Sequence, residues 1–541
     1  MNGLMQDHGL LISSVIRHAA ANHGEREIVS REPSGRLHRT NYREVERRAR
    51  QLASGLKQLG VRPGDRVATL AMNHFRHLEC FYAVSGMGAV LHTVNPRLFP
   101  DQIAFIINHA ESRILLLDAA FVPLIERLAA DLPRVEKLII LAEPQVTTDC
   151  TAFDALWYED FVASSPPGFE WPVFDEHAAS SLCYTSGTTG GPKGVLYSHR
   201  STLLHALATL QADSFGLRSV DVVLPVVPMF HVQAWSTPYG CAMAGTKLVL
   251  PGSQLDPRSL VELIQSESVT FALGVPTVWS SLVGHLRETH QSIPTLERVV
   301  IGGSAMPPAI HRELTETYGV RAVHAWGMTE VSPIGTIATT TGALEAAPEA
   351  ERAEALLKQG RASWGVELKV TGADGETLPR DGKSSGLLWV RGPWVARRYF
   401  RREEELLDAE GWFPTGDVAT LDGNGFLRIT DRDKDVIKSG GEWISSIDIE
   451  NIAMLHSGVR FAAAVGAHHP KWGERPVLVV VAVEGHAPTA EELLDFLRPR
   501  MAKWWLPDAV VFVRELPLTA TGKVLKSKLR ADYQHYLSAA D

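Results

Sequence analysis

Cysteine is scarce in this sequence of 541 residues, which contains four: Cys80, Cys150, Cys183 and Cys241. None of them forms a CxxC pair, and none stands in a histidine-rich spacing typical of metal ligands. The scarcity excludes a disulfide-stapled scaffold and a zinc-finger type of site. It predicts reduced, mostly buried thiols in a cytosolic protein.

Long apolar runs are also lacking. Stretches such as Val477–Val483 are far shorter than the roughly 20 residues that a membrane-spanning helix needs. The first residues lack the basic start and unbroken apolar core of a signal peptide. We therefore expect a cytoplasmic protein with no transmembrane segment.

An excess of positive charge is missing as well. The chain has 53 Lys and Arg against 62 Asp and Glu, a formal net charge of −9. Such a chain has no bulk attraction to a polyanion, so nucleic acid is not an expected partner. Apolar residues make up 45% of the sequence, enough for large cores and, at this length, for more than one domain.

Helix-like and strand-like stretches alternate over the first 330 residues. The pattern of Tyr42–Leu59 is typical of an amphipathic helix that stops at Gly60. The strand-like stretches are short and apolar: Arg66–Leu70, Ile114–Leu117, Leu138–Leu141, Leu248–Leu250, Phe271–Gly274, Val299–Ile301 and Ala322–His324. This alternation predicts parallel sheets covered by helices, with ligands bound beyond the carboxyl ends of the strands.

The pattern changes after Trp364. Turn pairs such as Asp422-Gly423 separate short strands, including Leu387–Val390 and Phe426–Ile429, which predicts a small antiparallel subdomain. A charged run, 431–435, then marks a candidate domain boundary. The last 107 or so residues read as a compact α+β unit that ends in a basic tail.

The segment 184–195, YTSGTTGGPKGV, is the strongest chemical signal in the chain. It lies between two strand-like stretches, and its glycines allow a backbone to approach a ligand closely. Within residues 185–194, the backbone N–H groups, four Ser and Thr hydroxyls and one ammonium can surround a polyphosphate. It lacks the G-x-x-x-x-G-K-[ST] order of kinases and GTPases, and the alternative is a plain Gly/Thr hairpin.

This segment resembles the signature loop of the adenylate-forming superfamily of acyl-CoA synthetases, adenylation domains and luciferases. The resemblance covers essentially the whole chain, because further motifs follow in order: 228–235, 302–306, 324–330, 415–417, 431–442 and 517–530. It is closest to bacterial medium-chain fatty-acid CoA ligases and 3-methylmercaptopropionyl-CoA ligases.

The resemblance implies an α/β fold: a large N-terminal region of two helix-covered mixed sheets plus a small β subdomain, and a small mobile α+β C-terminal domain. The expected boundaries are an AMP-binding domain at 1–430, a hinge at 431–434 and a C-terminal domain at 435–541. The C-terminal domain carries Lys523, which matches the catalytic lysine of the family.

The implied reaction uses ATP, coenzyme A and Mg²⁺. A carboxylate attacks the α-phosphate of ATP to give acyl-AMP and pyrophosphate, and the thiol of CoA then displaces AMP. Glu330 matches the Mg²⁺ ligand, with Thr185 as a second contributor, since hard cations prefer oxygen ligands. Lys523, His231, Thr329 and Glu330 are the expected catalytic residues.

The resemblance also implies the nucleotide and CoA contacts. Trp326 stands where the family more often has Tyr, and either ring can stack on adenine. Asp417 matches the carboxylate that accepts the ribose hydroxyls, and Arg432 matches a second ribose or phosphate contact. The other expected contacts are Thr185, Ser186, Gly187, Thr188, Thr189, Gly190, Lys193, Gly303, Ser304, Ala305, His324, Ala325, Thr329, Lys434, Lys438, Ser439, Gly440, Gly441 and Trp443.

The acyl pocket is expected at His231, Gln233, Trp235, Met328 and Trp443. Trp443 resembles the tryptophan that gates the acyl tunnel in bacterial fatty acyl-CoA synthetases. Lys471 and Arg475 are either contacts for CoA phosphates or ordinary surface charges.

A medium-chain fatty acid is the expected substrate. A 3-methylmercaptopropionate ligase, or a ligase for another short or aryl acid, is the alternative. Two other classes stay open: an adenylation enzyme that loads a carrier protein, and a non-catalytic adenylate-binding protein. The subgroup resemblance also suggests a homodimer.

Overall fold

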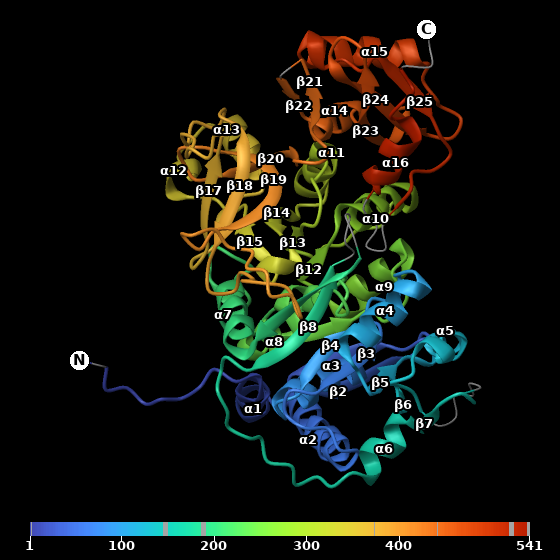
Figure 1. The fold of residues 1–541 in the computed structure, drawn as a ribbon, viewed down its shortest axis with the longest axis vertical. Helices are drawn as coiled ribbons and strands as arrows, with labels where there is room; N and C mark the ends of the chain where they lie inside the picture. The colour runs from blue at the N-terminus through green and yellow to red at the C-terminus, as the bar shows by residue number, and fades with distance from the viewer. Residues whose placement is uncertain are drawn as a thin grey trace.

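The computed structural model describes residues 1, 3–143, 150–185, 191–372, 374–440, 442–518 and 524–537. Its ribbon has a large lower body, a β-rich unit beside it and a separate C-terminal unit above both (Figure 1). The α-helices are α1 Ile12–Asn22, α2 Tyr42–Gln58, α3 Phe75–Gly86, α4 Pro100–Ala110, α5 Val122–Arg127, α6 Tyr158–Ser164, α7 His199–Leu210, α8 Thr237–Ala244, α9 Pro257–Glu267, α10 Pro276–Thr289, α11 Pro308–Arg312, α12 Gly342–Glu345, α13 Glu349–Leu357, α14 Ser446–Ala453, α15 Ala490–Leu497 and α16 Lys526–Tyr533.

Two mixed sheets form the large body. The first has nine strands in the order β16-β15-β14-β13-β12-β10-β11-β1-β2. Its strands are β1 Glu27–Arg31, β2 Leu37–Asn41, β10 Val222–Pro225, β11 Lys247–Leu250, β12 Phe271–Gly274, β13 Arg298–Ile301, β14 Arg321–Gly327, β15 Ile334–Ile337 and β16 Arg361–Ala362. Its inner strands pair in parallel, and antiparallel pairs stand at both edges.

The second sheet has seven strands in the order β7-β6-β5-β3-β4-β8-β9. Its strands are β3 Arg66–Leu70, β4 Val90–Thr93, β5 Ile114–Leu117, β6 Lys137–Ile140, β7 Asp154–Trp157, β8 Ala179–Thr185 and β9 Lys193–Ser198. All pairs are parallel except the last, β8 with β9. One apolar core joins side chains from both sheets with those of α1, α2 and α3.

The remaining strands form two smaller sheets. The β subdomain has the antiparallel order β17-β18-β19-β20, with β17 Glu367–Thr371, β18 Gly386–Arg391, β19 Phe413–Leu421 and β20 Leu427–Arg432. The C-terminal sheet contains β21 Ile437–Ser439, β22 Glu442–Ile444, β23 Val459–His469, β24 Gly473–Ala482 and β25 Ala509–Phe512. The predicted fold class is therefore confirmed.

Helix α2 illustrates why the local patterns predicted these elements well. The side chain of Asn41 accepts a hydrogen bond from the N–H of Glu44 and caps the helix. Val45, Leu52 and other apolar residues of one face are fully buried. The helix ends one residue before its predicted end, and Gly60 follows with φ +81°, a left-handed conformation that glycine adopts without strain.

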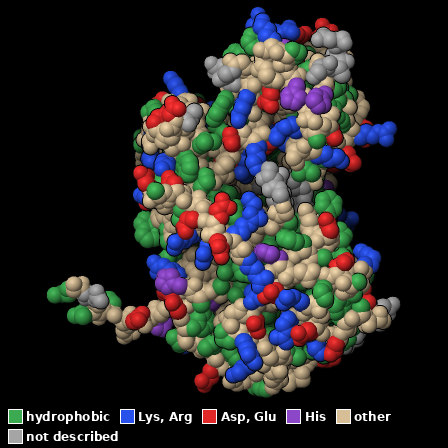
Figure 2. All heavy atoms as spheres, viewed as in Figure 1, with side chains coloured by type: hydrophobic (Ala, Val, Ile, Leu, Met, Phe, Trp, Pro, Cys, Tyr) green, Lys and Arg blue, Asp and Glu red, His purple; other side chains and the backbone are tan. Residues whose placement is uncertain are grey.

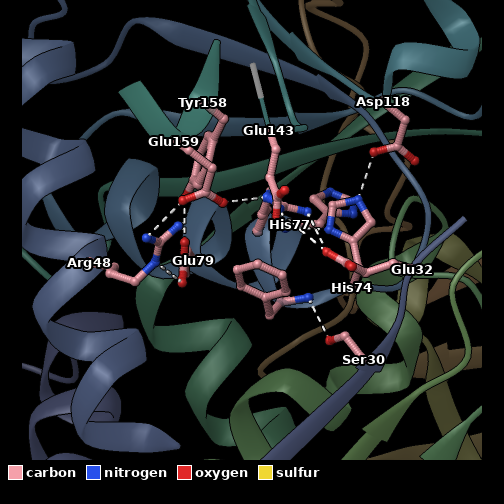
Figure 3. Close-up of polar contacts among 12 residues, drawn as sticks. Ser30, Glu32, Arg48, His74, His77, Glu79, Asp118, Glu143, Tyr158 and Glu159 are labelled. Carbon is pink, nitrogen blue, oxygen red and sulfur yellow. Dashed lines mark hydrogen bonds and ion pairs between the residues drawn. The ribbon is translucent and has the colours of Figure 1, made fainter. Parts of the chain in front are cut away.

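A largely buried ion-pair network connects side chains of α2, α3 and α6; Figure 3 shows its members. Arg48 donates to Glu79 at 2.7 Å and pairs with Glu159 at 3.0 Å. Glu79 is fully buried and also accepts from the hydroxyl of Tyr158. Arg76 extends the network from Glu159 at 2.6 Å toward Glu32. The network joins three helices of the large body through charge pairs that are largely withdrawn from water.

Acidic and basic side chains are interspersed over the face that Figure 2 shows, in keeping with the mixed charge of the sequence. Within the described part of the chain, no helix combines the length and the apolarity needed to cross a bilayer.

Candidate functional site

The phosphate-loop segment joins β8 to β9. Thr185 at the end of β8 pairs with Lys193 at the start of β9, so the two strands form an antiparallel hairpin. The carbonyl of Gly194 accepts a hydrogen bond from the N–H of Phe400 at 2.8 Å, which ties the hairpin to the segment that follows β18. The predicted contacts Ser186, Gly187, Thr188, Thr189 and Gly190 lie outside the described residues.

Thr329 and Glu330 lie beside this hairpin, in the short helix η5 (Thr329–Val331) that follows β14. The hydroxyl of Tyr197 on β9 donates to the carbonyl of Thr329 at 2.6 Å. The hydroxyl of Tyr399 donates to Oε1 of Glu330 at 2.7 Å. Thr329 and Glu330 are both buried, so the structure holds a carboxylate and a hydroxyl next to the loop strands.

Tyr399 is a functional candidate that sequence reasoning missed. Its ring centroid lies 4.9 Å from Nζ of Lys193, so one side chain contacts both the loop lysine and Glu330. Burial, followed by the charge of Glu330, raises the pKa of Tyr399, and the phenol therefore stays a donor. A tyrosine in an Arg-rich run carries no pattern by itself, so this role needed the tertiary structure.

Removal of the Tyr399 hydroxyl tests this role. Tyr399→Phe is expected to weaken binding of Mg²⁺-ATP about 10-fold or more, because it releases the orientation of a carboxylate ligand. Isothermal titration with ATP at several Mg²⁺ concentrations measures the effect without turnover. Tyr536→Phe, at an exposed tyrosine, is the control. Unchanged affinity, and an unchanged Mg²⁺ dependence, in Tyr399→Phe would contradict the role.

The donors near Glu330 fit Mg²⁺ in chemical type. Mg²⁺ sites usually combine one or two carboxylates with water and substrate phosphates rather than a protein cage. Among the described residues no cluster of three or more His, Cys, Asp or Glu could hold a metal. Glu330 with the hydroxyl of Thr185 is thus the kind of donor set that a nucleotide-borne Mg²⁺ uses.

A second cluster surrounds Asp417 on β19. Nε1 of Trp326 donates to Oδ2 of Asp417 at 2.8 Å, and Nε of Arg432 pairs with Oδ1 at 2.8 Å. Asp417 is 2% exposed, and the ring of Trp326 packs against Gly335, where a Cβ would lie 2.4 Å from it. The tryptophan that replaces the usual tyrosine therefore orients the predicted ribose carboxylate.

The predicted adenine strip follows β13 and β14. Gly303 has φ +89°, a conformation suited to glycine, and Ser304 and Ala305 follow it in the same loop. His324 on β14 is buried, and its Nδ1 lies 2.9 Å from the carbonyl of Leu357. Burial lowers the pKa of His324, so it is neutral. Backbone groups of Leu357, Ser304 and Lys358 interact with the ring and oppose this lowering, so His324 is tied to the predicted adenine strip through Ser304. The neighbouring Ala325 is buried in the same strand.

The predicted acyl-pocket segment has an unusual backbone. Residues 232–236, which form the turn η3 (Val232–Ser236), all have φ between 41° and 62°. Left-handed conformation costs non-glycine residues about 1–2 kcal/mol each. Gln233 donates to Ser181 on β8, and Ser236 lies 2.7 Å from Nδ1 of His205. His231 precedes the turn, and the other predicted wall residue, Met328, packs against the core of the β subdomain.

Trp235, the predicted aromatic residue of the acyl pocket, is buried in the core of the large body. Its ring packs over Gly302, at which a Cβ would lie 3.2 Å from the indole. Gly302 directly precedes the adenine strip, so the structure brings the acyl segment and the nucleotide segment together. The strained turn is held on both sides by buried polar contacts, which is typical of functional segments.

The predicted contacts of the C-terminal unit interact with their own neighbours. Nζ of Lys438 lies 3.7 Å from Asp433 and 6.0 Å from the ring centroid of Trp443. The N–H of Gly440 donates to the carbonyl of Trp472 at 2.8 Å. Lys434 adjoins Asp433 in the predicted hinge. Gly441 and Lys523 lie outside the described residues.

Arg475 resolves one of the alternatives left open by the sequence. It donates to Asp508 at 2.7 Å and to the carbonyls of Trp504 and Leu506, and it also lies near Ser439. Its side chain is 12% exposed. The guanidinium N–H groups of Arg475 are thus used in hydrogen bonds that connect β24 with residues 504–508 and with Ser439 on β21. This favours a structural role over contact with a CoA phosphate.

Comparisons with known proteins agree with this geometry. The AMP-binding enzyme family matches residues 16–400, and the AMP-binding enzyme C-terminal domain matches residues 448–523. The 3-methylmercaptopropionyl-CoA ligase of Ruegeria lacuscaerulensis is 51% identical over 539 residues, 99% of this chain and 100% of that protein. The medium-chain-fatty-acid–CoA ligase of Ectopseudomonas oleovorans is 48% identical and covers 98% of both chains.

A long-chain-fatty-acid–CoA ligase of Thermus thermophilus is 46% identical over 99% of this chain and 98% of that protein. Among solved structures, the anthranilate CoA ligase AuaEII in complex with anthranoyl-AMP superposes with a TM-score of 0.87 at 25% identity, over 99% of this chain and 100% of that chain. The chain therefore belongs to the AMP-binding enzyme family, the adenylate-forming superfamily that its motifs predicted.

Proposed function

We propose that this protein is an AMP-forming acyl-CoA ligase whose substrate is a fatty, medium-chain carboxylic acid. In the first step a carboxylate oxygen bonds to the α-phosphorus of ATP and pyrophosphate leaves. In the second, the CoA thiol loses its proton, sulfur bonds to the acyl carbon, and AMP leaves. The observation that carries the proposal is the segment 324–330, in which Trp326 donates to Asp417 and Glu330 accepts a hydrogen bond from Tyr399.

The residue roles follow from the chemistry of their side chains. We assign Asp417 and Arg432 to the ribose, and Lys193 with the loop 185–190 to the phosphates. His324 and the strip at 303–305 would meet adenine. The thioester-forming step would use residues around β21 and β22 for its contacts with CoA: Lys438, Ser439, Gly440, Gly441 and Trp443. We place the hinge at 431–434, between domains at 1–430 and 435–541.

Glu330 and Thr185 would hold Mg²⁺, which neutralises phosphate charge when it is bound. Thr329 would meet the reacting phosphate, and the hydroxyl of Tyr197 donates to its backbone carbonyl and holds it beside β9. Lys523 would neutralise the carboxylate and the α-phosphate as they approach. We assign His231 to the carboxylate end of the acyl pocket.

The acid itself is the finer part of the proposal. The acyl pocket would be lined by Gln233, Trp235, Met328 and Trp443. The ring of Trp235 packs over Gly302. Relatives near 50% identity are named for 3-methylmercaptopropionate and for medium-chain fatty acids. 3-Methylmercaptopropionate is therefore the alternative substrate, after a medium-chain fatty acid.

A panel of acids tests the substrate. We expect CoA-dependent AMP formation to have its highest kcat/KM among hexanoate, octanoate and decanoate. Each methylene is worth about 0.8 kcal/mol, so acids that differ by one methylene should differ at most about four-fold, and neighbours in this series of even-numbered acids at most about 15-fold. A higher kcat/KM for methylmercaptopropionate or cinnamate would replace the fatty acid. Acyl transfer to a holo-carrier protein without turnover of free CoA would favour a carrier-loading enzyme instead.

We further propose a cytoplasmic enzyme of lipid metabolism that acts as a homodimer. Leu4 and Met5 are exposed on the N-terminal segment, which runs away from the body in Figure 1 and offers an apolar contact for a second copy. Light scattering after size-exclusion chromatography measures the oligomeric state. A monomeric mass would contradict the dimer.

A further inference from the structure

A buried lysine occupies the core of the C-terminal unit. Lys526 begins α16, and its Nζ donates to Oε1 of Glu450 at 2.7 Å and to the hydroxyl of Ser446 at 2.6 Å. Its side chain is 13% exposed and that of Glu450 is 14% exposed. Glu450 also accepts from the N–H of Ala464 at 2.8 Å. Lys526 therefore joins α16 to α14 and, through Glu450, to β23.

The same cluster reaches the last strand of the β subdomain. The N–H of Ser446 donates to Oδ2 of Asp431 on β20 at 2.6 Å. Ser445 donates to the carbonyl of Thr430, and Arg428 pairs with Asp448 at 2.9 Å. Asp431 is 1% exposed. Helix α14 is thus attached to Lys526 on one side and, on the other, to Asp431, the first residue of the proposed hinge at the end of β20.

Charge explains why a lysine is needed at this place. Burial raises the pKa values of both Asp431 and Glu450, so each carboxylate is costly to keep ionised. Burial would lower the pKa of Lys526, but Glu450 and Asp431 together raise it. The lysine is the cation that lets these two carboxylates be buried close to each other. Without it, an uncompensated pair of acids would remain in the core.

The lysine also follows closely after Lys523. Leu518 and Val524, which flank residues 519–523, pair as an antiparallel bridge. The N–H of Leu525 donates to the carbonyl of Pro517 at 2.7 Å. The two ends of the short segment that contains Lys523 are thus joined to each other. Lys526 directly follows Leu525, the residue that makes the second of these contacts.

We propose that Lys526 is a positioning residue for the adenylation step. It fixes Leu518 and Val524, the joined residues on either side of the segment that carries Lys523, to α14 and through Ser446 to β20. The inference rests on the proposed function, since it concerns the step that Lys523 serves. A displacement of about 1 Å at a reacting group can cost roughly 100-fold in rate.

The test separates the two half-reactions. Lys526→Met keeps the length and apolar stem of the side chain and removes its charge. We expect ATP–pyrophosphate exchange with octanoate to fall about 100-fold. Thioester formation from supplied octanoyl-AMP and CoA should fall less than about three-fold, because that step does not use Lys523. Lys526→Arg should restore most of the exchange, since it keeps the cation.

The controls decide between positioning and general damage. Lys528→Met, at an exposed lysine two residues further along α16, should leave both half-reactions unchanged. Glu450→Gln keeps the shape of the cluster, and we expect it to show the same one-sided loss on a smaller scale. It serves as the test if Lys526→Met does not fold. Thermal unfolding of each variant reports the folded fraction.

Two outcomes would overturn the inference. Lys526→Met and Glu450→Gln could lower both half-reactions equally, as a merely structural role requires, or leave exchange unchanged. Failure of the proposed function looks different, because the wild-type protein itself would then show no exchange with any acid in the panel.

Discussion

Replacing Lys523 with alanine is expected to reduce acyl-adenylate formation by about 100- to 1000-fold, because the cation that offsets two approaching anions is lost. Conversion of supplied acyl-AMP to the thioester should remain within about three-fold of the wild-type rate. In that step AMP departs and no carboxylate has to approach a phosphate, so the lysine is not needed to offset their repulsion. Pyrophosphate exchange and thioester formation, measured separately, report the two steps.

The control for this experiment is Lys503→Ala, which removes an exposed lysine of the same C-terminal unit. It should leave both rates unchanged. Equal losses in the two steps of Lys523→Ala would mean that Lys523 is not confined to adenylation. The split result would support a C-terminal domain that presents different residues to the two steps.

Arg48→Met is expected to destabilise the large body by about 3–5 kcal/mol, because it leaves the fully buried carboxylate of Glu79 without its cation. In the wild-type protein Arg48 donates to Glu79 at 2.7 Å. Burial raises the pKa of Glu79 by more than the charge of Arg48 lowers it. Denaturant unfolding followed by tryptophan fluorescence measures the loss.

Two further variants sharpen this prediction. Arg47→Met removes an exposed arginine of the same helix, paired with Glu44, and should cost less than about 1 kcal/mol. Combining Arg48→Met with Glu79→Met removes both charges and should recover much of the loss. If Arg48→Met is as stable as Arg47→Met, the network is not important for stability.

The pH dependence of Arg48→Met has a defined sign. A carboxyl whose pKa is raised on folding destabilises the folded state as pH rises above its unfolded pKa. Loss of Arg48 removes a favourable charge and raises the pKa of Glu79 further. The stability deficit of the variant should therefore be smaller in mildly acidic buffer than at neutral pH.

Local pattern was enough for most individual elements. Arg66–Leu70, Ile114–Leu117 and Phe271–Gly274 were predicted with the bounds that the structure has. Each is a short apolar run between turn signals, and such runs depend on neighbouring residues alone. The nucleotide contacts, which stay predictions, could be assigned from the family motifs, because each motif is a contiguous segment with its own chemistry.

Pairing between distant segments could not be predicted in this way. Strand β1 pairs with β11, with Ile28 opposite Leu248, although about 220 residues separate them. None of the residues in the left-handed turn at 232–236 is a glycine, so the sequence gives no sign of positive φ angles there. It persists because buried contacts at Ser181 and His205 hold it on both sides.

The sequence by itself therefore determined the family and its acyl-CoA ligase chemistry, and it predicted Glu330, Asp417 and Lys523 as residues of that chemistry. Only the tertiary structure decided how these residues are held. Tyr399 orients Glu330, Trp326 orients Asp417, and Lys526 gathers Glu450 and Ser446 beside Asp431. The physical reason is that a reacting group is recognised by its local motif, whereas its support comes from side chains that meet only after distant strands and helices have packed.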